Sequence, residues 1–398
     1  MDVLISGASV AGPVLAYWLA RAGFTPTVVE RTPQLRLGAG GHAVDLFAPA
    51  MTVAERMGIV PTLREAALGQ STLRLERPGR PAIDADFTGL SDAFADGSHV
   101  EVMRGDLAST LHDVTRDDVE YVFGDSIREL AEDERGVDVV FDSGRTRRFD
   151  LVIGADGLHS AVRRLTFGPE EEFHHYLGGY LAVFTVPNQH GTPGPTRLYS
   201  TVDRVVATYP VPRTDQARAV LLFRRAAQLS YDRRDVAEQK RLLRAEFAGE
   251  GWEVPRLLGA LDDADDFYLD SISQIRMDTW SRGRVTLVGD AGYSPGPAVG
   301  GGTTLAMAAA YVLGRALAEH RGDHAAAFAA YEDRVRDYVL RCRRVAPRTL
   351  RSGIPRSRAQ VAFSAAAMRA LPRLPSALRH RILADRASGT LSSFTLPD

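Results

Sequence analysis

Hydrophobic residues near the start of the chain follow a strand pattern and then a helix pattern. An apolar run at 3–5 leads into a turn of small residues at 7–12. Beyond the turn, apolar residues recur every three or four positions up to Gly23, as expected for an amphipathic helix that ends at a glycine. A second apolar run, 27–29, then stops at Glu30. The pattern therefore predicts a strand–turn–helix–strand unit at this end of the sequence.

Later parts of the chain repeat these patterns. The unbroken apolar run at 151–153 is typical of a buried parallel strand, and a second strand is predicted at 285–288. Helical periodicity predicts further helices at 49–57, 104–113, 234–248 and 304–319. Alternating apolar and polar positions predict antiparallel strands at 120–123, 126–131 and 137–141, and several more between 173 and 225. This mixture indicates an α/β fold with a mainly antiparallel part.

The first turn has the residues of a dinucleotide-binding fingerprint. Gly7 permits a tight turn, Gly12 lets the helix pack closely on the strand, and Ser9 stands where the fingerprint has its second glycine. The N-terminus of the helix offers unpaired N–H groups and a positive dipole end to a pyrophosphate. Glu30 stands where an acid binds a ribose diol. A unit of the same shape without a ligand is the alternative.

Two later segments bring polar residues to similar turns. In the first, a buried apolar run delivers Asp156 and Gly157 to a turn, and Ser160 can cap the helix that follows. In the second, Asp290 directly follows an apolar run, at the carboxyl end of a strand, where open α/β sheets bind ligands. A glycine triplet then leaves the N–H groups of the next helix bare toward negative charge: Gly300, Gly301 and Gly302.

The amino-acid composition argues against several classes of protein. The chain has 398 residues, 45% of them hydrophobic, and a net charge of −2, so neither a nucleic acid nor a membrane is an expected partner. Cys342 is the only cysteine, which excludes an intrachain disulfide and a thiolate metal cluster. His174 and His175 would point to opposite faces of a strand, so no metal site is predicted. No secretory signal pattern is present, and a cytoplasmic protein is expected.

Together, the three turns resemble those of the FAD-dependent aromatic hydroxylase family, which has the para-hydroxybenzoate hydroxylase fold and includes tetracycline-modifying monooxygenases. The resemblance runs from residue 1 to about residue 345 and rests on the order and separation of the turns. This chain departs from the family near the third turn. Gly292 and Tyr293 replace an Ala-His pair, Gly301 stands where a glutamine is common, and Thr304 stands where an asparagine is common.

The resemblance implies binding roles for the matching residues. The ADP half of FAD would be held by Gly7, Ser9, Gly12 and Glu30, with Arg31 beside them. Arg104 would support the phosphates or the ribityl chain, and Asp290 would bond the ribityl chain. Asp156 and Gly157 would form a motif associated with both FAD and NADPH. The isoalloxazine would lie along Pro297, Gly300, Gly301 and Gly302.

The resemblance also implies a domain arrangement. An α/β fold is expected, with a dinucleotide-binding (Rossmann-like) FAD domain, an inserted and mainly antiparallel β substrate domain covered by one helix, and C-terminal helices. The FAD domain is expected from 1–70, 98–170 and 272–345, and the substrate domain from 71–97 and 171–271. The C-terminal segment, 346–398, is expected to lay helices across both domains.

For function, the resemblance implies an FAD-dependent monooxygenase. Such an enzyme hydroxylates an aromatic or polyketide-like small molecule through a flavin C4a-hydroperoxide, with NADPH or NADH as a transient reductant. The departures near the third turn keep two alternatives open. One is an FAD-binding enzyme that performs oxidation or cyclisation without oxygen insertion, and the other is a non-catalytic FAD-dependent binding protein.

Candidate substrate contacts come from the aromatic residues of the strands at 173–225 and from a histidine after a Gly-rich turn. They are His42, Tyr180, Phe184, Tyr199, Tyr209 and Phe223. Aromatic residues on strands are more often core than ligand contacts, so each also has a purely structural interpretation. The sequence assigns no general base and no catalytic residue. It also does not identify the substrate, the choice between NADH and NADPH, or the oligomeric state.

Overall fold

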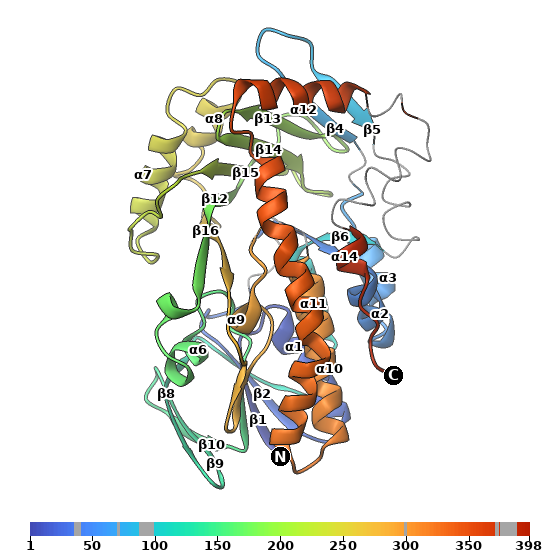
Figure 1. The fold of residues 1–398 in the computed structure, drawn as a ribbon, viewed down its shortest axis with the longest axis vertical. Helices are drawn as coiled ribbons and strands as arrows, with labels where there is room; N and C mark the ends of the chain where they lie inside the picture. Colours follow the sequence, from blue (N-terminus) through green and yellow to red (C-terminus); the bar gives the residue numbers. More distant parts are fainter. Residues whose placement is uncertain (36–40, 70–71, 87–98, 298–300, 371–373, 375–387) are drawn as a thin grey trace.

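The structure is a computed structural model of the 398-residue chain. It describes residues 1–35, 41–69, 72–86, 99–297, 301–370, 374 and 388–398. Figure 1 shows two large sheets, one near each end of the molecule, with the long helix α11 (His324–Gly353) running between them.

The first sheet has six strands in the order β17-β18-β11-β1-β2-β7. Their bounds are β1 (Asp2–Ser6), β2 (Thr25–Glu30), β7 (Glu120–Phe123), β11 (Leu151–Gly154), β17 (Ser281–Arg282) and β18 (Val285–Leu287). All neighbours are parallel except β17 and β18. The apolar runs of β1, β11 and β18 are buried, as their sequences predicted. The antiparallel prediction for 120–123 is wrong, because β7 extends the parallel sheet beside β2.

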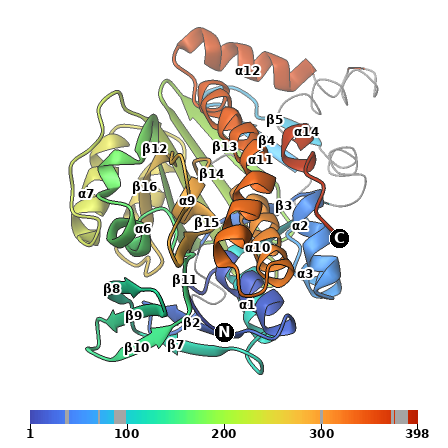
Figure 2. The same cartoon turned by 60° about the horizontal axis from the view of Figure 1, so that its bottom comes forward.

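Helices cover this first sheet and two small sheets flank it. The helices are α1 (Ala11–Arg21), α2 (Ala48–Arg56), α3 (Val60–Glu65), α5 (Arg104–Asp113), α6 (Ala161–Thr166), α9 (Asp290–Tyr293) and α10 (Gly302–Glu319), with a 3₁₀ turn at Glu170–Glu172. Helix α10 packs between α1 and α11 (Figure 2). The flanking sheets are β3 (Ala43–Leu46) with β6 (Val100–Met103), and β8 (Ile127–Asp133), β9 (Gly136–Phe141) and β10 (Thr146–Phe149).

The second large sheet has seven strands in the order β16-β12-β15-β14-β13-β4-β5. Their bounds are β4 (Thr72–Glu76), β5 (Ile83–Asp86), β12 (His174–Pro187), β13 (Thr196–Thr201), β14 (Arg204–Pro210), β15 (Gln216–Arg224) and β16 (Tyr268–Ile275). Only the β13–β4 pair is parallel. One face packs against two helices, α7 (Val236–Glu246) and α8 (Val254–Gly259), where a single helix was expected.

The C-terminal helices connect the two sheets. Leu350 and Ile354, at the end of α11, pack on the face of the seven-stranded sheet that lies opposite α7 and α8. Helix α12 (Arg358–Ala370) crosses the outer edge of the same sheet, and α14 (Ser388–Ser392) returns to α2 and α11. The expected domain boundaries at 271/272 and 345/346 fall inside β16 and α11. Within the described part of the chain, no helix is both long and apolar enough to cross a bilayer.

Candidate functional site

The first turn is a close crossing of backbone segments. Gly7 has φ +110°, a left-handed conformation that favours glycine, and a Cβ there would lie 2.5 Å from the carbonyl oxygen of Ala155. A Cβ on Gly12 would overlap the carbonyl oxygen of Gly7. Both glycines therefore let β1, α1 and the turn after β11 approach more closely than any side chain would permit.

Polar groups gather at the N-terminus of α1. No side chain caps this end of the helix and its first turn holds no acid. The Arg104 guanidinium, from the start of α5, donates to Ser9 Oγ at 3.2 and 3.0 Å. Glu30 accepts from the Ala8 amide at 3.0 Å, and Arg31 is exposed beside it. The bare helix end and Arg104 together favour an anionic ligand here.

The second motif forms its turn through the Asp156 side chain. The Asp156 carboxylate accepts from Ser160 Oγ at 2.5 Å and from the amides of Ala161 and Val162 at 2.8 and 3.1 Å. Burial raises the pKa of Asp156, while these three donors oppose the shift. Gly157 follows with φ +82°. The carboxylate thus secures the start of α6 and fixes the turn that faces Gly7.

The third motif meets the first at close range. A Cβ on Gly289 would lie 3.4 Å from the Cβ atoms of both Ala11 and Ala306, so α1, α9 and α10 converge there. Burial raises the pKa of Asp290, and the positive charge of Arg104 opposes that shift. Asp290 and Arg104, which bonds Ser9 of the first motif, are therefore close enough to interact electrostatically.

The glycine triplet is described only in part. Gly300 lies outside the described residues, and Pro297 is the last described residue before it. Gly301 precedes α10, and a Cβ there would overlap the side chain of Leu391 from α14. Gly302 begins α10, where a Cβ would lie 3.9 Å from Asp290 Oδ1.

The residues that the three turns bring together are suited to bind FAD. The close approach at Gly7 and Gly12 leaves room for backbone contact with a pyrophosphate, and Glu30 ends the next strand, β2. Arg104 supplies a cation between the α1 end and Asp290. Residues that were separated by almost three hundred positions in the sequence thus border one space.

The six candidate substrate contacts divide into two groups. Tyr209 and His42 lie where the seven-stranded sheet meets β3, and the Tyr209 hydroxyl accepts from the Ala43 amide at 2.8 Å. Burial, followed by the charge of Arg104, lowers the pKa of His42 to about 4, so its ring is neutral near pH 7. The other four are in the core against α7 and α8, on the covered face of the sheet: Tyr180, Phe184, Tyr199 and Phe223. The structure corrects their assignment, because all four are buried in this core cluster.

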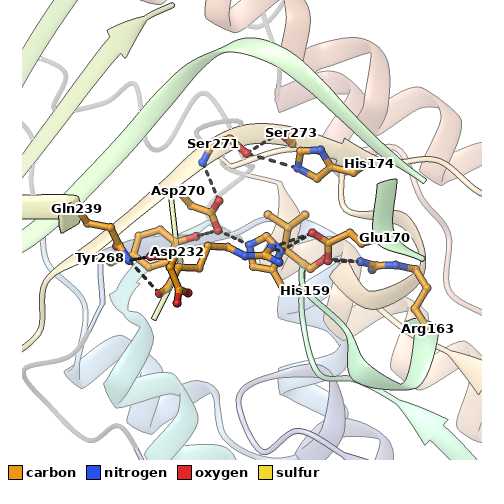
Figure 3. A network of polar contacts seen from close by, with 12 residues as sticks. His159, Arg163, Glu170, His174, Asp232, Gln239, Tyr268, Asp270, Ser271 and Ser273 are labelled. Atoms are coloured by element: carbon orange, nitrogen blue, oxygen red, sulfur yellow. Dashed lines mark hydrogen bonds and ion pairs between the residues drawn. The ribbon is translucent and has the colours of Figure 1, made fainter. Parts of the chain in front are cut away.

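Sequence reasoning missed a polar network that joins the second motif to the seven-stranded sheet. His159 lies between two carboxylates, with Nε2 2.7 Å from Asp270 Oδ2 and Nδ1 2.9 Å from Glu170 Oε1 (Figure 3). Arg163 donates to Glu170 at 2.9 Å, and the Tyr268 hydroxyl donates to Asp270 at 3.2 Å. His159 comes two residues after Gly157 of the second motif, and this position was the one signal that could have identified it from the sequence.

Tyr268 extends this network toward the flavin motifs. Partial burial, followed by the Asp270 carboxylate, raises the pKa of Tyr268 well above its ordinary value, although 37% of the residue is exposed. The charges of Arg104 and Asp290 also act on this phenol. Tyr268, on the seven-stranded sheet, is therefore within electrostatic range of Arg104 and Asp290.

Comparisons with known proteins agree with this geometry. A family model described as FAD binding domain matches residues 1–352. A flavin-dependent monooxygenase from an unknown prokaryotic organism is 38% identical over 338 residues, which cover 85% of this chain and 86% of that protein.

Solved structures show the same arrangement of elements. The crystal structure of tetracycline destructase Tet(51) matches with a TM-score of 0.86 at 30% identity, covering 100% of this chain and 99% of that one. Klebsiella pneumoniae HpxO, complexed with FAD and uric acid, matches with a TM-score of 0.74 at 26% identity, covering 98% of this chain and 97% of that one. The chain belongs to the FAD-binding domain family of flavin-dependent monooxygenases.

Proposed function

We propose that this protein hydroxylates an aromatic or polyketide-like small molecule, with FAD as cofactor, O2 as oxidant and NADPH or NADH as reductant. The observation that carries the proposal is the apolar face of the seven-stranded sheet opposite α7 and α8. Leu181, Val183, Val205 and Ile272 are buried in this face beneath Leu350 and Ile354 of α11. The residues beside them are only partly buried and supply the apolar surface that a substrate would contact: Leu177, Leu198, Val220 and Leu222. An apolar face beside the flavin motifs suits a ring system better than a small polar substrate.

Relatives that act on ring systems support this substrate class. Tet(51) is described as a tetracycline destructase, and HpxO was crystallised with uric acid. Both match nearly the whole chain, including the seven-stranded sheet. Their ligands are the rational starting points for a substrate screen.

The residues of this chain would hold and enclose the flavin. FAD, once bound and reduced, supplies the electrons that activate O2. Thr304, in the first turn of α10, accepts from the Phe47 amide at 3.0 Å and donates to the Asp45 carbonyl at 3.1 Å, which fixes β3 and α2 against that helix. Leu391 covers Gly301 and excludes water from that side.

On the substrate side, one polar group is placed to act on a bound phenol or enol. Tyr268 is 37% exposed and its hydroxyl proton is held toward Asp270 Oδ2. This phenol can donate or accept a hydrogen bond while its high pKa keeps it neutral. We assign Tyr268 to substrate positioning within the proposed reaction.

The experiment uses the FAD-loaded protein with NADPH, isotopically labelled O2 and a ring-compound panel that begins with tetracycline and uric acid. The proposal expects substrate-dependent NADPH consumption and one labelled oxygen atom in the product. Turnover without labelled product would favour oxidation or cyclisation. Stoichiometric binding without turnover would favour the non-catalytic alternative, and either outcome would overturn the proposal.

A further inference from the structure

A cavity of about 300 Å³ lies outside the flavin site, between the start of β12, the segment after β16 and the middle of α11. Its volume falls within the range of small-molecule sites. The polar part of its lining is strongly cationic and holds a single carboxylate: His175, Arg276, Asp278, Arg336 and Arg343. Trp280 and three aliphatic side chains complete the wall.

Two of the three arginines have only neutral partners. Arg276 donates to the amide oxygen of Gln274 at 3.1 and 2.9 Å. Arg343 donates to the carbonyl oxygen of Ile275 at 2.6 Å. Over the ranges that the structure describes, no carboxylate lies within ion-pair distance of either guanidinium. Their charges are therefore left uncompensated at the cavity wall.

The electrostatics of the wall favour a negatively charged ligand. Burial, followed by the charges of Arg276 and Arg336, lowers the pKa of Arg343 to about 10. Burial, followed by the charges of Arg276, His174 and Arg343, lowers the pKa of His175. Two buried N–H donors of the lining, Arg343 Nε and Trp280 Nε1, have no acceptor among the described residues. Buried donors normally have partners, so an acceptor in the cavity would complete this arrangement.

The cavity shares a wall with the third flavin motif. The Trp280 ring packs against Tyr293 with 4.4 Å between ring centroids, and Tyr293 ends α9, which Asp290 begins. The Gln274 side-chain amide donates to the carbonyl oxygens of Pro295 at 3.0 Å and Arg343 at 2.7 Å. Gln274 thereby links the cationic wall to the loop that leads to Pro297.

We propose that this cavity binds the phosphate groups of a small molecule, as a phosphate monoester or a pyrophosphate. Guanidinium groups recognise phosphate oxygens through paired, charge-assisted hydrogen bonds, and Arg276 and Arg343 present two such groups to this cavity. Arg336, the third arginine of the lining, is already paired with Glu332 at 2.7 Å. The volume accommodates more than one phosphate group. The site lies behind the third motif and does not depend on the proposed hydroxylation.

The first test is a calorimetric titration of the FAD-loaded protein with inorganic pyrophosphate, at low and at high salt. Arg276→Gln is the test variant, because Arg276 is exposed and its only bonds go to the Gln274 amide oxygen. Arg344→Gln is the control, since Arg344 is exposed on α11, beside Arg343 in the sequence, and does not line the cavity. Thermal melting would establish that both variants fold.

We expect the wild type and Arg344→Gln to bind pyrophosphate with similar Kd, and Arg276→Gln to bind about tenfold or more weakly, the loss expected for one charge-assisted partner. High salt should weaken wild-type binding. Absence of measurable binding to the wild type would overturn the proposal. Equal binding by wild type and Arg276→Gln would overturn it as well.

A competition experiment identifies the source of the phosphate. If NADPH displaces pyrophosphate, and Arg276→Gln raises the KM for NADPH without changing kcat, the site holds the phosphates of the nicotinamide nucleotide. If NADPH does not compete while pyrophosphate binding still requires Arg276, the site holds a different phosphorylated molecule. Both results uphold a phosphate site, and neither depends on the identity of the hydroxylated substrate.

Discussion

At the scale of single residues, Gly12 has the least space for an added side chain. A Cβ there would overlap the Gly7 carbonyl oxygen, and both atoms belong to backbone that cannot move independently. Gly12→Ala should therefore destabilise the protein by about 3 kcal/mol and reduce FAD content. Thermal melting and flavin absorbance per protein would measure both effects. Gly259→Ala is the control, because nothing lies within 4 Å of its Cβ position, and equal behaviour of the two variants would contradict the packing argument.

A substitution at Asp290 tests whether the third motif binds FAD. If its carboxylate bonds the ribityl chain of FAD, Asp290→Ala should weaken FAD binding by about 10- to 100-fold, the range for a lost hydrogen bond to a charged group. Fluorescence titration of the apoprotein with FAD would give the Kd. Asp263→Ala, at an exposed position away from the motifs, should bind normally. An Asp290→Ala protein that purifies with full flavin content would refute the assigned role.

His42 predicts a pH dependence of stability. Its pKa in the folded protein is about 4, against an ordinary value of 6.5. Between these values the unfolded chain binds a proton that the folded protein does not, so stability falls as the pH falls. From pH 7 to pH 5, His42 should account for about 2 kcal/mol of the loss in unfolding free energy. Urea unfolding of His42→Gln should show a smaller loss, and identical pH profiles would contradict the prediction.

At the scale of elements, α14 and the start of α10 are fitted to each other. Leu391 is fully buried against Gly301, where relatives often have a glutamine. Gly301→Gln should push α14 away, and limited proteolysis should then cut the C-terminal segment faster. Leu391→Ala in the same chain should relieve the clash. Gly353→Gln, at a position with no neighbour within 4 Å, should leave the cutting rate unchanged. Unchanged proteolysis of Gly301→Gln would argue against this contact.

Some elements were predictable because local chemistry determines them. The helix at 104–113 matches α5 residue for residue, and the apolar runs of β11 and β18 became buried parallel strands. The strand at 120–123 was assigned the wrong direction, because alternation reports a half-buried face and does not identify the neighbouring strand. Tyr180 and Phe223 were misplaced for a related reason. Strand alternation shows that they share a face with each other, but only the tertiary structure shows that α7 and α8 cover that face.

At the scale of the whole molecule, side-chain hydrogen bonds connect the seven-stranded sheet to the segments that carry the flavin motifs. Arg218, which is fully buried in β15, donates to the Gly41 carbonyl oxygen at 3.1 Å, and Tyr209 holds the adjacent Ala43 amide. On the other side, His159 connects the second motif to Asp270 of β16. Such long-range pairs have no periodic signal in the sequence, which is why the His159 network became visible only in the structure.

These hydrogen bonds determine how the seven-stranded sheet lies relative to the flavin motifs, and therefore where the flavin and a substrate would meet. The fold and the three flavin turns followed from the sequence because their glycines and acids stand at fixed offsets from apolar runs. The substrate face did not, since its apolar residues, such as Val220 and Leu222, look like any other strand residues. The proposed reaction therefore depends on how the two large sheets are positioned relative to each other, and no single sequence motif determines that position.

The most direct test of the account is an absorbance spectrum of the purified protein, followed by anaerobic addition of NADPH and then by O2. The account predicts flavin peaks, bleaching by NADPH that is faster when a suitable ring compound is present, and recovery of the peaks with O2 consumption. A protein that binds no flavin would contradict the site. Bound flavin that NADPH cannot reduce, even with candidate aromatic compounds present, would contradict the proposed monooxygenase function.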